Sequence, residues 1–144
     1  MKRIFQTGTN EEYLNILVLI LRITLAAFMI THGGPKLSKL LAGGEIQFGD
    51  PLGLGPSISL ILVVFAEFFC SLLIGIGLGT RLAAIPLMIT MLVAAFISHG
   101  PDPFRRKETA LLYFLFYLAL LVIGSRKYSF DYLMTRKTER ISEA

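Results

Sequence analysis

Two long apolar runs in this chain each carry one charged residue near their midpoint. The first run, Tyr13–Thr31, has Arg22 at its centre, and the second, Ser57–Leu78, has Glu67 beside its centre. Each run is long enough to cross a bilayer, which takes about 20 mainly apolar residues. An ionised side chain at that depth is costly unless it faces the interior of a helix bundle and finds a partner. We therefore expect Arg22 and Glu67, at equal depth on consecutive antiparallel helices, to pair.

Two further apolar runs, Leu82–Ile97 and Thr109–Gly124, follow the first two. With 54% hydrophobic residues, the chain has too little polar sequence to cover four such helices with a water-facing surface. A cleavable signal peptide is disfavoured, because Glu11 and Glu12 precede the first run where positive charge is expected. The predicted fold is an all-α integral membrane four-helix bundle.

The connection after the first run is the longest and is rich in glycine. Within it, Pro35–Gly43 predicts a short interfacial helix, since proline suits a first helical position and the leucines share one face. We expect three parts: a cytoplasmic N-terminal segment (residues 1–12), a transmembrane domain (residues 13–133) and a polar cytoplasmic tail (residues 134–144).

The distribution of Lys and Arg predicts the orientation. Eight lie on the side of the termini and five on the other side, which places both termini in the cytoplasm of a multi-pass plasma (inner) membrane protein. The net charge of +4 then indicates topology and contact with anionic lipid, and no nucleic-acid partner is expected.

Cys70 is the only cysteine, which excludes an intramolecular disulfide, a CxxC pair and a multi-cysteine metal site. No metal site is predicted, and redox chemistry would need a bound cofactor or a partner protein. A haem held by His32 and His99 is a weaker alternative, because both histidines lie at helix ends.

The remaining polar residues fall near the helix ends. We expect His32, Lys36 and His99 on the extracytoplasmic side, and Arg81 and Asp131 as a structural pair on the cytoplasmic side. The spacing of Tyr113, Phe116 and Tyr117 places them on one helix face, where they could stack on a quinone ring or simply fill the bundle core. The Arg22–Glu67 pair is likewise open to a functional or a purely structural role.

Four segments together resemble the DoxX family. They are RITLAAFMITHGGPKL (residues 22–37), AEFFCSLLIGIGLGTRLAA (residues 66–84), MLVAAFISHG (residues 91–100) and GSRKYSFDYL (residues 124–133). The resemblance implies a four-helix membrane bundle, and the family's namesake is a subunit of a thiosulfate:quinone oxidoreductase. Other members are linked to membrane complexes that handle oxidative stress. The polar positions that match the family pattern are Arg22, His32, Lys36, Glu67, Arg81, His99 and Asp131.

The sequence and this resemblance lead to one principal hypothesis, a membrane subunit of a quinone-linked oxidoreductase or redox-stress complex. Glu67 and Arg22 are the expected catalytic residues, with a quinone as cofactor. The expected ligand-binding residues are His32, Lys36, His99, Tyr113 and Tyr117. Besides the bilayer, a soluble or membrane redox partner protein is expected, and a homo-oligomer is an open alternative. Two other functions stay open: a small-solute or proton transporter, and a non-catalytic membrane anchor or assembly factor.

Overall fold

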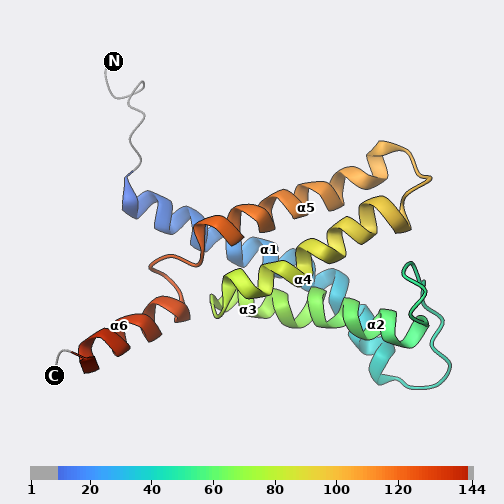
Figure 1. The fold of residues 1–144 in the computed structure, drawn as a ribbon, viewed down its shortest axis with the longest axis horizontal. Helices are drawn as coiled ribbons and strands as arrows, with labels where there is room; N and C mark the ends of the chain where they lie inside the picture. The colour runs from blue at the N-terminus through green and yellow to red at the C-terminus, as the bar shows by residue number, and fades with distance from the viewer. Residues whose placement is uncertain (1–9, 143–144) are drawn as a thin grey trace, which may run out of the picture.

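The computed structural model describes residues 10–142, and this part of the chain is helical with no β-strand (Figure 1). The elements are α1 Glu11–Leu41, α2 Pro56–Val64, η2 Phe65–Cys70, α3 Ser71–Ile76, α4 Thr80–Val93, η3 Ala94–Ser98, α5 Phe104–Ile123 and α6 Phe130–Ser142. The segments η2 and η3 are π-helical and continue their neighbours, so α2–η2–α3 forms one rod and α4–η3 another. The start of α1 and the helix α6 lie at the same end of the molecule (Figure 1).

Three of these helices are long and apolar enough to cross a membrane, among the residues described: Glu11–Ala42, Pro56–Ile76 and Thr80–Ser98. Large apolar side chains such as Ile20, Phe65 and Ile89 are about half exposed on their outer faces, as expected for a surface that meets lipid. The prediction of an all-α membrane protein is therefore confirmed. The helix α5 also runs antiparallel to α4 (Figure 1), but its N-terminal part carries Arg105, Arg106 and Lys107.

The predicted interfacial helix is not a separate element, because α1 continues without a break through Pro35 to Leu41. Proline usually disfavours helical conformation in the residue before it, largely through contact with the Cβ atom of that residue. The preceding residue is Gly34, which has no Cβ, so the helix can pass through. The prediction of a helix end near Thr31 was therefore wrong by about three turns.

The predicted boundary between the transmembrane domain and the C-terminal tail falls inside a helix. The helix α6 spans residues 130–142 and so crosses the expected boundary at residue 133. Residues 1–9, which include Lys2 and Arg3 and most of the predicted N-terminal segment, lie outside the described residues, as do residues 143–144.

Close backbone contact sets the register of α1 against the α2–η2–α3 rod. A Cβ atom built on Gly33 would lie 2.8 Å from the carbonyl carbon of Glu67, and one built on Gly75 would lie 3.0 Å from Cβ of Ala26. The helix α1 and the α2–η2–α3 rod are therefore antiparallel, with Gly33 beside Glu67 and Ala26 beside Gly75. Because Gly33 is eleven residues beyond Arg22, Glu67 lies about 16 Å further along α1 than Arg22 does.

This contact generates a first prediction, for Gly33→Ala with Gly34→Ala as its matched control. A methyl group at residue 33 would overlap the η2 backbone, whereas a Cβ at residue 34 would meet no atom of another element within 4 Å. We expect Gly33→Ala to lower the free energy of unfolding by about 1–3 kcal/mol, the usual cost of overpacking. Gly34→Ala should cost less than Gly33→Ala, because its methyl group meets only the neighbouring Pro35 and the helix propensity of alanine offsets part of that contact. Equal stability of the two variants in detergent unfolding would contradict the register described here.

Candidate functional site

The guanidinium group of Arg22 is buried at the end of the bundle where α1 begins, and its hydrogen-bond partners among the described residues are all backbone oxygens. Its Nε donates to the carbonyl of Ile74 at 2.9 Å and its Nη2 to that of Gly75 at 3.0 Å. Its Nη1 donates to the carbonyls of Ser125 at 2.7 Å and Tyr128 at 3.0 Å. The predicted pair with Glu67 is therefore not formed, since Arg22 engages the end of α3 and the α5–α6 connection instead.

The position of Arg22 follows from how α3 ends. The last carbonyls of a helix lack intrahelical partners and carry partial negative charge, so a cation is favourable there. The chain then turns at Gly77, whose φ of 75° is in the left-handed region, and its N–H bonds the carbonyl of Leu73. A Cβ at Gly77 would also overlap the Arg22 guanidinium, so glycine is required there for two reasons.

Asp131 and Arg81 lie near each other but have separate partners. The Asp131 carboxylate accepts the backbone N–H groups of Gly79 at 2.7 Å and Thr80 at 3.3 Å, which caps the start of α4. Arg81 donates from Nη2 to the carbonyl of Val122 at 3.1 Å. The prediction that Arg81 and Asp131 pair was therefore wrong, because helix-end backbone groups compete for both side chains.

The carboxylate of Glu67 pairs with Lys36 at the opposite end of the bundle. Lys36 Nζ lies 2.6 Å from Oε1 and 2.5 Å from Oε2 of Glu67. The Glu67 side chain is only 7% exposed, and that of Lys36 is 30% exposed. Glu67 is carried by the π-helical turn η2, a distortion that often marks functional sites. This charge pair is enclosed but reachable, as a ligand site requires.

A cavity of about 230 Å³, here called the Glu67 cavity, surrounds this pair. One helical face of α1 contributes residues at i, i+3 and i+7, and one face of α5 contributes the opposite wall. The ring of His32 meets that of Tyr113 edge-on, with centroids 6.5 Å apart. The lining residues are Met29, His32, Lys36, Glu67, Met91, Ala94, His99, Arg106, Thr109, Ala110 and Tyr113.

His99 enters this cavity from the end of η3 as part of a polar cluster at the mouth. Its Nδ1 lies 2.8 Å from Oδ2 of Asp102, and Arg106 Nη1 lies 3.4 Å from Oδ1. The hydrogen bond to His99, and then that from Arg106, hold the pKa of Asp102 below its usual value, so it is ionised at neutral pH. Asp102 and Arg106 were not predicted to be site residues, although their i, i+4 spacing was a usable signal.

Tyr117 lies one turn deeper than Tyr113, and the two rings stack at 6.2 Å between centroids. Tyr117 is almost fully buried, whereas Phe116 is 43% exposed and faces an adjoining apolar groove of about 320 Å³. That groove shares Thr109 and Tyr113 with the Glu67 cavity. Of the predicted site residues, His32, Lys36, Glu67, His99 and Tyr113 are thus brought together, with Tyr117 beneath them and Arg22 at the other end.

The fold and this enclosed ionic site define a small helical membrane protein. A DoxX family model matches residues 17–100 of the sequence, and the chain belongs to the DoxX family. An uncharacterized protein of Haemophilus influenzae is 30% identical over 131 residues, which cover 84% of this chain and 92% of that protein. No solved structure matches the chain.

The separation of Arg22 from Glu67 generates a second prediction, tested by a double-mutant cycle. Arg22→Leu leaves buried carbonyls without donors, and each unsatisfied polar group costs about 1–3 kcal/mol. Glu67→Leu strands Lys36 instead. Because the two sites share no partner and lie far apart, the two losses should add within about 0.5 kcal/mol in the double variant.

Arg22→Lys provides the control for charge, because one ammonium group cannot serve all the carbonyls that the planar guanidinium reaches. We expect it to lose nearly as much stability as Arg22→Leu. A double Leu variant that recovers stability over the single variants would instead show that Arg22 and Glu67 are partners.

Proposed function

We propose that this chain is the membrane subunit of a quinone-linked oxidoreductase or redox-stress complex, with the quinone head group held in the Glu67 cavity. The observation that carries the proposal is the junction of a charged cavity with an apolar groove at Thr109 and Tyr113. A ligand suited to that junction has a polar ring and a hydrocarbon tail, which is the chemistry of a lipid-soluble quinone.

The groups around the cavity fit such a head group. Lys36 and His32 are positioned to donate hydrogen bonds to a ring carbonyl, and Tyr113 presents an aromatic face backed by Tyr117. The apolar groove, lined by Leu21, Leu25, Phe28 and others, would hold the tail. A quinone bound there would accept two electrons and two protons when reduced. These residues would bind and orient it and exclude water from its ring.

Glu67 is the residue that we assign to proton handling. Its carboxylate is buried, lies against Lys36, and faces the cavity that opens near His99 and Asp102. The carboxylate would be balanced by the Lys36 ammonium when it is ionised, and it would become neutral when it takes up a proton from the cavity. In this proposal Arg22 is structural, because its donors are committed to carbonyls.

We further propose that α5 is the fourth span and that the start of α1 and the helix α6 both lie on the cytoplasmic side. Ion pairs of Arg126 with Glu11 at 3.1 Å and of Lys127 with Glu12 at 3.2 Å hold the start of α1 against the α5–α6 connection. The Glu67 cavity would then open in the extracytoplasmic half of the membrane. The buried Cys70 supplies no redox pair, so electrons would come from a partner protein or a soluble reductant.

The third prediction tests quinone binding directly. One portion of the protein, purified in mild detergent, is extracted with solvent and the extract is analysed for quinone by mass spectrometry. A short-chain quinone is titrated against a second portion of the folded protein in detergent. We expect saturable binding that weakens at least tenfold in Glu67→Gln or Lys36→Met, equivalent to about 1.4 kcal/mol. Loss of the paired charge removes charge-assisted hydrogen bonds around the ring.

Glu108→Gln is the matched control, because Glu108 is exposed on α5 and does not line the Glu67 cavity. It should bind quinone like the wild type, with the same helix content and thermal stability. Absence of co-purified quinone together with no saturable binding would refute the proposal. So would equal affinity of the Glu67→Gln variant and the wild type.

A further inference from the structure

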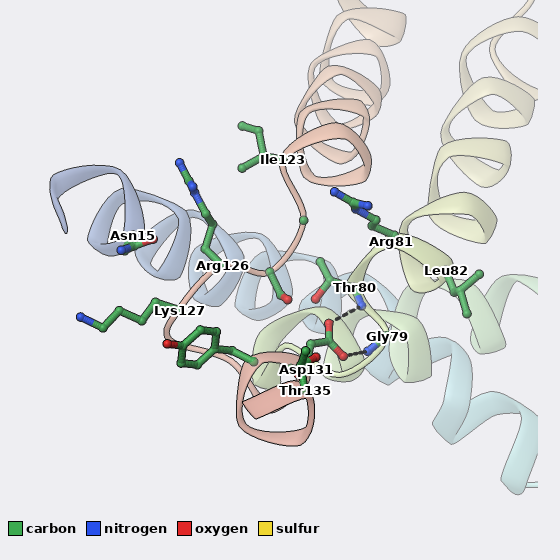
Figure 2. A pocket seen from close by; sticks show the side chains of 13 residues that line it. Asn15, Gly79, Thr80, Arg81, Leu82, Ile123, Arg126, Lys127, Asp131 and Thr135 are labelled. Atoms are coloured by element: carbon green, nitrogen blue, oxygen red, sulfur yellow. Dashed lines mark hydrogen bonds between the residues drawn. The ribbon is translucent and has the colours of Figure 1, made fainter. Parts of the chain in front are cut away.

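A second, larger cavity lies at the other end of the bundle, where α1 begins and α6 follows α5 (Figure 2). It has a volume of about 610 Å³ and is here called the Arg81 cavity, after one of its basic residues. Its basic side chains are Arg81, Arg126 and Lys127, with Asn15 at one edge and α6 forming another wall through Tyr132. Neither the family resemblance nor the quinone proposal gives this cavity a role.

Two buried polar atoms in its lining have no hydrogen-bond partner among the described residues. One is the hydroxyl of Thr80, a residue that is 0% exposed, and the other is Nε of Arg126. A buried polar group without a partner costs about 1–3 kcal/mol, so such groups usually mark a place where water or a ligand binds. Both atoms are hydrogen-bond donors, which indicates a ligand rich in acceptors.

Arg126 and Lys127 each contact an acidic residue of α1, Glu11 and Glu12, through one nitrogen atom, and the donors left over, together with those of Arg81, favour an anionic ligand. Figure 2 shows the side chains of Arg81 and Arg126 on either side of the connection between α5 and α6. Arg81 has one bond, to the Val122 carbonyl, which leaves most of its donors for a ligand. Asp131 also lines the cavity, but its two carboxylate oxygens already accept the N–H groups of Gly79 and Thr80.

We propose that the Arg81 cavity binds the phosphate group of an anionic phospholipid. Arginine recognises phosphate through its planar fork of donors, and a threonine hydroxyl adds a short neutral hydrogen bond. Gly124, with a φ of 78°, makes room for this arrangement, because a Cβ there would lie 3.2 Å from Nε of Arg81. A larger residue at position 124 would displace the arginine from the cavity wall.

Two features favour a lipid over free phosphate as the source of that group. The cavity lies where the helices that can cross a membrane begin or end, which is the level expected for lipid head groups. The helix α6, which borders it, exposes Phe130 and Leu133 on neighbouring turns, at 54% and 59%. An amphipathic helix of that kind lies in the membrane interface beside the head groups.

The test measures binding of water-soluble, short-chain phosphatidylglycerol to the purified protein in detergent, with short-chain phosphatidylcholine and inorganic phosphate as the other ligands. We expect saturable binding of phosphatidylglycerol and much weaker binding of the other two. Arg81→Gln and Arg126→Gln should each raise its Kd roughly fivefold, the effect of one basic residue near an anionic head group. Arg105→Gln, an exposed arginine at the far end of the bundle, is the matched control and should bind like the wild type.

Thr80→Val separates ligand binding from folding. Removing a buried, unpartnered hydroxyl should leave the unliganded protein as stable as the wild type or more stable, while weakening phosphatidylglycerol binding. Thr80→Ser should retain the affinity. A threonine needed only for structure would not produce that opposite pair of effects, and Thr80→Val also tests the site if Arg81→Gln fails to fold.

Three outcomes would overturn the proposal. Equal affinity for phosphatidylglycerol and phosphatidylcholine would exclude an anion site, and saturation by inorganic phosphate at the same Kd would show a free-phosphate site instead. Equal weakening by Arg105→Gln would show attraction to overall charge alone. Glu67→Gln should leave phosphatidylglycerol binding unchanged, so this result and the quinone result can fail independently.

Discussion

The four hydrogen bonds from Arg22 to backbone carbonyls are the interaction on which the rest of this structure depends. They join three parts of the chain that are far apart in sequence: α1, the end of α3 and the connection from α5 to α6. A guanidinium group can make all of these bonds at once because its donors are rigid and always charged. The end of the bundle is thereby closed around one buried cation, with Gly77 giving it space.

With that end fixed, the glycines on the helix faces determine which polar residues meet at the other end. Gly33 allows the backbone of η2 to approach α1 closely, and this places Glu67 within reach of Lys36, which is almost one turn beyond Gly33. Small residues at such contacts are typical of helices that pack within membranes. The Lys36–Glu67 pair is thus a consequence of helix register, and the Glu67 cavity forms around it.

Much of the candidate site could be predicted from sequence, because residue type and position at helix ends were informative. His32, Lys36, His99 and Tyr113 were expected near a ligand, and the structure places all of them in the cavity that holds Glu67. The partner of Glu67 could not be predicted, because the first helix was expected to end near Thr31. Apolar composition marks where a helix can lie in lipid, but it does not mark where the helix stops. The helix α1 continues through Pro35, and Glu67 lies beside Gly33, about three turns further along α1 than the expected position beside Arg22.

The separation of the two buried charges also bears on which function the fold favours. About 16 Å of α1 lies between the levels of Arg22 and Glu67. The core between them is mainly apolar, with Leu25, Met29, Cys70 and Ile74 in one cluster, and the hydroxyls of Ser71 and Tyr117 are buried there without a hydrogen-bond partner among the described residues. In the proposed function Glu67 would exchange protons through the Glu67 cavity, and no chain of hydrogen bonds links it to Arg22 among the described residues. Proton exchange at one face suits a site that loads a membrane-soluble ligand, whereas transport requires access from both faces. On this physical ground the quinone-linked function is favoured over the transporter.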